Sequence, residues 1–142
     1  MRCLASGRQA TAQQTAAGWE AALAGMLGTV AAMSDRVVLI GDTPQSAVDP
    51  PVCLSANPDD AVACATRRSE AIDTARLEAD RRAAAEAGVD FIDPSAWLCP
   101  SDPCPVVIGS VLVYHDRGHM TQTFATALAP YLGAALGSNP TR

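Results

Sequence analysis

A strand–turn–strand pattern late in the chain limits what this sequence can fold into. Two β-branched, apolar runs, Val106–Ile108 and Val111–Val113, are separated only by Gly109-Ser110. A Gly-X pair between two such runs is typical of a two-residue type II′ hairpin turn. The sequence therefore predicts an antiparallel hairpin at this point.

The second run leads into a short polar loop and then into a helix. Apolar residues from Phe124 to Leu136 recur with a period of about 3.6, and Thr121 is the predicted N-cap. Asp116 and His119 lie three residues apart in the loop, where side chains are exposed at the edge of a rigid scaffold. A carboxylate beside an imidazole can fix its tautomer, so that the ring can take a proton from a hydroxyl nucleophile. The alternative is that Asp116 caps the turn and His119 is a surface or capping histidine.

Helices and apolar strands alternate upstream of this segment. A helix is predicted over residues 11–33, a fully buried parallel strand at Arg36–Ile40, a second helix over 67–87 with a solvated charged face, and a strand at 89–93. Gly88 is the predicted left-handed residue that ends the second helix. The apolar stripe of the first helix consists of Trp19, Leu23, Met26, Leu27 and Val30. This alternation predicts a right-handed, parallel, three-layer α/β fold.

Residues 44–66 contain four prolines and no helical period, and we expect a long irregular loop there. Cys53 and Cys64 close part of this loop, and Cys99 and Cys104 close a second one. Short Pro- and Asp-rich loops of this kind suit local disulfides in an oxidising compartment. Cys3 is left over from the set of five cysteines.

A zinc site is the alternative use of two of these cysteines. Cys99, Cys104, His115 and His119 come close to the spacing of a Cys2His2 site. The gap between the cysteines and the histidines is shorter than usual, however, and the predicted hairpin occupies it. We therefore expect no metal site and no cofactor.

Composition excludes several classes of partner. Apolar residues make up 49% of the 142 residues, which is enough for a core; the net charge is −5, and all basic residues are Arg. An acidic chain without a basic cluster is not expected to bind nucleic acid or an anionic membrane. No apolar run reaches the 18 residues of a membrane span, and the first 25 residues lack the pattern of a signal peptide.

The segment VLVYHDRGHMT (residues 111–121) resembles the last sequence block of the SGNH domains found at the C-terminus of bacterial acyltransferase-3 proteins. In that family a D-x-x-H-[LM]-[ST] run supplies the Asp and His of a Ser-His-Asp set. Two further stretches resemble the family in the same order: VVLIGDTP (37–44) with DPPVCL (49–54), and WLCPSDPCPVV (97–107). The similarity runs from about Trp19 to Leu136.

The resemblance implies a flavodoxin-like α/β/α sheet of which this chain is the C-terminal portion. It implies the disulfides Cys53–Cys64 and Cys99–Cys104, and it makes His119 the general base and Asp116 its orienting partner. The expected division is a disordered leader at 1–10, an SGNH-like domain at 11–137 and a tail at 138–142.

The nucleophile of such a set is missing from the expected place. Gly41-Asp42-Thr43 resembles the family's G-D-S, but a separate D-T-P segment of its second half matches better, and Pro44 disfavours the short helix that should follow a nucleophile. Thr43 is therefore a disfavoured candidate. The serines lack a strand–G-D-S–helix context; they include Ser34, Ser46, Ser69, Ser95, Ser101 and Ser110. We expect an N-terminally truncated SGNH domain that carries the Asp–His half of the triad.

Besides a small zinc-binding module, which would use the Cys2His2 spacing described above, two functions are open from the sequence. The first is part of a serine esterase or O-acyltransferase domain acting on cell-envelope glycans, with an acylated glycan or acyl donor as substrate. Its partners would be a membrane acyltransferase segment or an N-terminal half domain, and full-length relatives would work outside the cytoplasm. The second is a catalytically inactive, disulfide-stapled α/β module that binds a partner or is a remnant.

Overall fold

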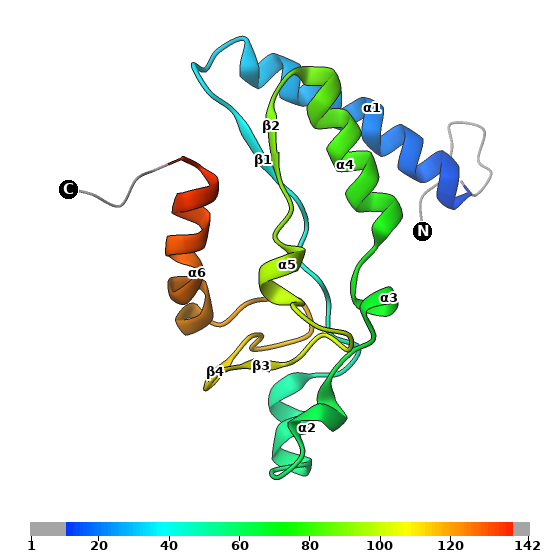
Figure 1. Cartoon of the computed structure of the whole chain (residues 1–142). Coiled ribbons are helices and arrows are strands. Elements are labelled where there is room, and N and C mark those ends of the chain that lie inside the picture. Colours follow the sequence, from blue (N-terminus) through cyan, green and yellow to red (C-terminus); the bar gives the residue numbers. More distant parts are fainter. Residues whose placement is uncertain (1–10, 138–142) are drawn as a thin grey trace. The chain divides into compact units, whose positions relative to one another are not determined.

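The computed structural model describes residues 11–137, and Figure 1 shows its helices and strands. The chain forms two compact units. Among the described residues, unit 1 contains residues 11–42 and 74–93, and unit 2 contains residues 43–73 and 94–137. The predicted leader with Cys3 and the predicted tail lie outside the described residues. None of the described helices has the length and apolar content that crossing a membrane requires.

Unit 1 consists of two helices packed on a parallel pair of strands. Its elements are α1 (Ala12–Ala31), β1 (Val38–Ile40), α4 (Thr74–Ala87) and β2 (Asp90–Ile92). The strands pair in parallel with Leu39 opposite Phe91. Figure 1 shows α1 and α4 on the same side of the two strands, and Leu39 and Phe91 pack against the apolar core that the helices form.

Helix α1 begins at Ala12, directly after its N-cap residue Thr11. Thr11 accepts a hydrogen bond from the Gln14 N–H, and the Gln14 side chain accepts one from the Thr11 N–H, which is a capping box. The predicted helix is confirmed. Its stripe is narrower than predicted, because Leu23 and Leu27 are buried whereas Met26 is 55% exposed.

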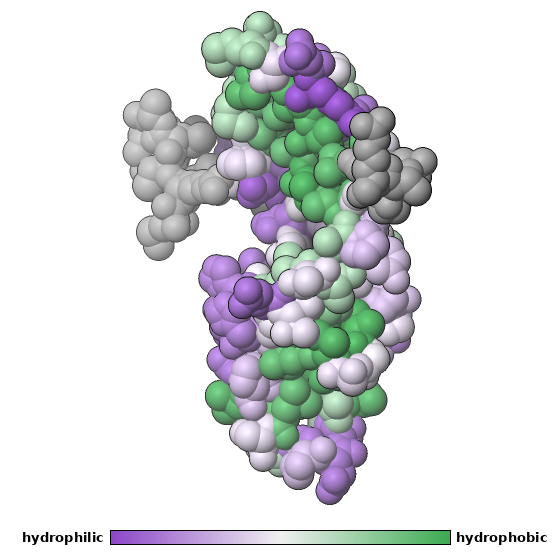
Figure 2. All heavy atoms as spheres, turned by 90° about the vertical axis from the view of Figure 1, so that its left-hand side faces the viewer, coloured by the Kyte–Doolittle hydropathy of each residue, from purple (hydrophilic) through white to green (hydrophobic). Residues whose placement is uncertain are grey.

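Strand β1 is less buried than its apolar run predicts. Ile40, at its end, is 47% exposed, and Figure 2 shows a band of apolar surface on this unit, in the upper part of the view. The prediction of a fully buried strand is therefore wrong. The parallel pair with packed helices is that of an α/β protein, whereas the three-layer arrangement stays a prediction.

The predicted helix over residues 67–87 is two helices. A short α3 (Arg68–Ala71) ends at Ile72, and α4 starts anew at Thr74. Gly88 has a φ of 67° and ends α4 as predicted. The charged face is not wholly solvated, since Asp80 is buried and accepts a hydrogen bond from Trp19 Nε1 at 2.6 Å.

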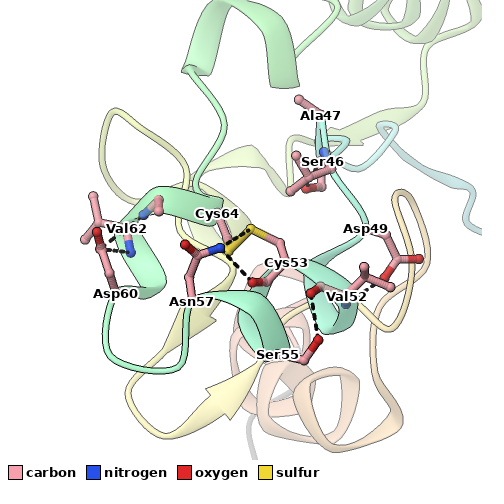
Figure 3. The surroundings of a disulfide bond; sticks show 12 residues. Ser46, Ala47, Asp49, Val52, Cys53, Ser55, Asn57, Asp60, Val62 and Cys64 are labelled. Carbon is pink, nitrogen blue, oxygen red and sulfur yellow. Dashed lines mark hydrogen bonds between the residues drawn. A yellow bond between two sulfur atoms is a disulfide. The ribbon is translucent and has the colours of Figure 1, made fainter.

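The predicted loop over residues 44–66 contains two short helices. Helix α2 (Pro50–Ala56) starts after Asp49, whose side chain accepts from the Val52 N–H, and proline occupies its first turn. A 3-10 helix, η1, follows at Ala61–Cys64. The two helices are joined by the predicted disulfide between Cys53 and Cys64, shown in Figure 3.

Polar side chains form hydrogen bonds next to the disulfide between α2 and η1. Asn57 Nδ2 donates to the Cys53 carbonyl oxygen at 2.9 Å, and Asp60 Oδ1 accepts from the N–H groups of Val62 and Ala63 (Figure 3). The connection from α2 to η1 is therefore held by side-chain-to-backbone hydrogen bonds as well as by the disulfide.

The hairpin and the last helix of unit 2 are confirmed. Strands β3 (Val107–Ile108) and β4 (Val111–Leu112) pair antiparallel, and Gly109 at their turn has a φ of 62°. Ser110 has a negative φ, which fits a type II′ turn and excludes type I′. A short α5 (Ser95–Leu98) precedes the hairpin, and α6 (Gln122–Ala135) follows it with Thr121 as N-cap.

The core of unit 2 lies between the hairpin and α6. Leu98, Val113, Tyr114 and Phe124 are buried together, with Trp97 packed against them. Helix α6 is continuous through Pro130, although a proline inside a helix usually kinks or ends it. The core thus places β4 and the first turn of α6 side by side, and the segment between them carries Asp116 and His119.

Candidate active site

The loop between β4 and α6 is closed at its base by backbone pairing. Tyr114 and Met120 form an antiparallel bridge, and the His115 N–H donates to the His119 carbonyl oxygen at 3.0 Å. Tyr114 is buried in the core of unit 2, and its burial raises the pKa of its hydroxyl. The five residues 115–119 therefore project from a fixed base.

The Asp116 carboxylate is held by the backbone of its own loop. Its Oδ1 atom accepts hydrogen bonds from the N–H groups of Gly118 and His119, each at 2.8 Å. These two donors stabilise the charged form, first Gly118 and then His119, and they hold the pKa of Asp116 well below its usual range. The carboxylate is consequently ionised and has a defined orientation.

The His119 ring is in direct contact with this carboxylate. Its Nδ1 atom lies 2.7 Å from Asp116 Oδ2 and 3.0 Å from Oδ1. A carboxylate in this position favours the tautomer with hydrogen on Nδ1, which makes Nε2 the ring nitrogen that can accept a proton. The side chain of His119 is 78% exposed, so Nε2 can be reached from solvent. This geometry suits a general base that acts on an incoming hydroxyl group.

His115 belongs to the same cluster, although the sequence offered it no role beyond the rejected zinc spacing. Its ring stacks on that of His119, with centroids 5.7 Å apart and planes 13° from parallel. Its Nδ1 atom lies 3.6 Å from Asp116 Oδ2. His115, Asp116 and His119 are the described residues that could hold a metal ion together.

A contact with a distant segment holds the loop from one side. The Ser46 N–H donates to the Arg117 carbonyl oxygen at 2.7 Å, and Arg117 Nε donates to the Ser46 carbonyl oxygen at 3.3 Å. Ser46 is buried and follows the D-T-P segment by two residues. No sequence motif indicates this contact, because the two residues are 71 positions apart.

The candidate nucleophiles are placed as follows. Thr43 is half-buried after β1, and the next helix, α2, begins only at Pro50. Gly41 has a packing reason of its own, since an added Cβ would lie 3.0 Å from Leu77 Cδ1 and 3.1 Å from Phe91 Cζ. Its presence before Asp42-Thr43 is therefore no sign of a nucleophile. Two of the serines are buried and four are exposed; the buried ones are Ser46 and Ser95.

The Cys2His2 zinc alternative is wrong. Cys99 and Cys104 are joined in a disulfide with an S–S distance of 1.98 Å, so neither sulfur is a thiolate that could bind a metal ion. The bridge is buried and packs beside Ala71 and Ile72. It is a structural staple of unit 2, as the sequence predicts.

Comparison with known proteins gives one family. The family model described as "SGNH domain (fused to AT3 domains)" matches residues 4–134. No curated protein and no solved structure matches the chain. The match covers both units and includes the loop that carries Asp116 and His119.

Proposed function

Because this chain belongs to the family of SGNH domains that are fused to AT3 domains, we propose that it is part of a serine esterase or O-acyltransferase domain. In this proposal His119 is the general base and Asp116 orients it. The single observation that supports these roles is the 2.7 Å contact between His119 Nδ1 and Asp116 Oδ2. The SGNH family membership supports the reaction class, and fusion to AT3 domains supports acyl transfer.

The proposed reaction needs a serine that these residues do not supply in a suitable setting. His119 Nε2 would take the proton of that serine as its oxygen attacks the acyl carbonyl, and would then return the proton to the leaving group. We assign the serine and the oxyanion donors to a separate segment with a G-D-S after a strand. The two strands of unit 1 would then belong to a larger parallel sheet, the middle layer of a three-layer α/β/α fold.

The proposed substrates are acylated glycans of the cell envelope. Fusion to AT3 domains indicates that full-length relatives act outside the cytoplasm. The two disulfides of unit 2 support an oxidising compartment for this chain as well, because disulfides persist there. The acyl donor would come from the membrane acyltransferase partner.

The test is hydrolysis of a chromogenic acetyl ester by the chain alone and by the chain mixed with a G-D-S-bearing N-terminal half of an SGNH domain. We expect activity only in the mixture. His119→Ala should lower the rate at least about 1,000-fold, since a triad acts as a unit. Gln122→Ala, an exposed change in the first turn of α6, is the matched control and should leave the rate unchanged. An inactive mixture, or a fully active His119→Ala chain, would refute the proposal.

A non-catalytic module is the second candidate function. The setting of the serines favours it, since Ser46 and Ser95 are buried and Ser110 occupies the hairpin turn. A fluorophosphonate probe separates the two candidates. Labelling of the partner's serine that requires His119 supports the enzyme, and absence of labelling in the mixture supports the module.

A further inference from the structure

We propose that His115, Asp116 and His119 form a binding site for a divalent transition metal ion such as Zn²⁺. One ligand atom from each residue lies within 4.8 Å of the other two. The site is distinct from the Cys2His2 arrangement, because both of its nitrogen ligands and its oxygen ligand come from the five-residue loop between β4 and α6.

The distances within the cluster suit a zinc ion after a small movement. Zn–N and Zn–O bonds of about 2.0–2.1 Å in a tetrahedral site put ligand atoms about 3.3 Å apart. The Nδ1 atoms of His119 and His115 lie 2.7 and 3.6 Å from Asp116 Oδ2, on either side of that value. All three ligand atoms lie within 4.8 Å of one another, so rotation of the two exposed imidazole rings has to close a gap of at most about 1.5 Å.

The backbone of the loop fixes the positions of the two histidines and the orientation of the carboxylate. The His115 N–H bonds to the His119 carbonyl oxygen, which fixes the two histidines opposite each other. Asp116 Oδ1 is occupied by the N–H groups of Gly118 and His119, which leaves Oδ2 to face both rings. A site whose carboxylate is oriented by such bonds loses little entropy when the ion binds.

The donor set selects the class of ion. Two imidazole nitrogens and one carboxylate oxygen suit Zn²⁺, Ni²⁺ and Cu²⁺, whereas Mg²⁺ and Ca²⁺ require oxygen ligands. Three protein ligands also leave one tetrahedral position for water. The loop therefore binds zinc and does not bind magnesium at comparable concentrations.

Binding of the metal ion prevents His119 from acting as general base. This consequence rests on the proposed function. The ion occupies His119 Nδ1 and Asp116 Oδ2, the same two atoms that form the hydrogen bond of the catalytic pair. The ring hydrogen then resides on Nε2, which can no longer accept a proton from serine. Zinc is thus an inhibitor of the complemented enzyme.

The test uses the full chain with its disulfides intact and with Cys3→Ser, so that the remaining thiol cannot bind zinc. Isothermal titration with ZnCl₂ should give one equivalent bound, and titration with MgCl₂ should give none. His115→Ala and Asp116→Asn should each weaken binding at least about 10-fold, since even outer-shell changes cost 10–100-fold. Glu86→Gln removes an exposed carboxylate of unit 1 and should bind zinc like the parent chain.

Two outcomes would overturn the inference: no saturable zinc binding by the parent chain, or unchanged affinity in His115→Ala. His115 is exposed, so its loss is not expected to unfold the chain, and circular dichroism checks this. Nitrogen-15 spectra of the imidazole rings give a second readout, in which zinc should shift the Nδ1 signals of both histidines. Because zinc binding needs no serine segment, its failure would leave the proposed function standing, and an inactive mixture would leave the metal site standing.

Discussion

Among single residues, Asp80 is buried although the sequence places it on a charged helix face. It is 4% exposed and accepts from Trp19 Nε1 at 2.6 Å and from Arg76 Nε at 3.2 Å. The Arg76 guanidinium lies 3.5 Å from the centre of the Trp19 ring. A buried charge with two donors is compensated, but it depends on both of them.

Trp19→Phe should therefore destabilise unit 1 by about 1.5–3 kcal/mol, the usual contribution of a hydrogen bond to a charged group. Urea denaturation followed by circular dichroism measures the change. Glu20→Gln is the control, since its partner Arg82 is largely exposed, and it should cost less than about 1 kcal/mol. Equal losses in the two variants would contradict this account of Asp80.

Residue patterns predicted the positions of Asp116 and His119 but not everything around them. The three-residue spacing at a strand-to-helix junction was sufficient to place the pair, because both residues belong to one short loop. His115 and the Arg117–Ser46 contact were missed. The first had no motif, and the second joins residues 71 positions apart. The catalytic roles themselves stay a prediction.

At the scale of elements, Thr121 connects the hairpin to α6. Its Oγ1 atom accepts from the Phe124 N–H at 3.1 Å as the N-cap, and its hydroxyl donates to the Leu112 carbonyl oxygen at 2.6 Å. Its own N–H donates to the Val113 carbonyl oxygen at 2.9 Å. One side chain thus fixes the far end of the loop that carries His119.

Thr121→Ala should cost about 2 kcal/mol, one part for the cap and one for the bond to Leu112. Thr11→Ala removes an exposed cap of α1 and should cost about 1 kcal/mol. Thermal unfolding of each variant measures the difference. Thr121→Ser keeps the hydroxyl and should recover most of the loss; if it is as unstable as Thr121→Ala, the two hydrogen bonds are not the cause.

Helix and strand boundaries could be predicted where a turn or capping residue next to the boundary determines it. The Gly109-Ser110 turn and the Thr121 cap specified the hairpin and α6. The break before α4 could not be predicted in this way. Arg68 is held by distant groups: its N–H donates to Asp102 Oδ1 at 3.0 Å, and its guanidinium donates to the Cys99 carbonyl oxygen at 2.6 Å. Helix α2, by contrast, had an unused local signal in Asp49-Pro50, an N-cap followed by proline.

In the molecule as a whole, the disulfides are distributed unequally between the two units. Both disulfides lie in unit 2, while unit 1 depends on the packing of α1 and α4 around Leu23 and Leu27. A disulfide that closes a loop of 5 to 11 residues contributes about 2–3 kcal/mol in the chain-entropy account. Reduction of both disulfides therefore lowers the stability of unit 2 and removes no covalent link from unit 1.

Reduction should loosen unit 2 selectively. Hydrogen exchange followed by mass spectrometry, with and without dithiothreitol, should show faster exchange in residues 43–73 and 94–137. Protection in residues 11–42 and 74–93 should stay close to that of the oxidised chain. Equal acceleration in both ranges would show that the two units unfold as one.

The tryptophans are divided between the units. Trp19 lies in unit 1 against the Arg76 guanidinium, and Trp97 lies in unit 2 against the apolar core around Leu98. Indole emission responds to its surroundings, so the chain carries a built-in fluorescent label on each half. In a Trp97→Phe chain the emission would come from Trp19 and report on unit 1 alone. Subtracting that emission from the emission of the parent chain would give the signal of Trp97 in unit 2, without any added dye.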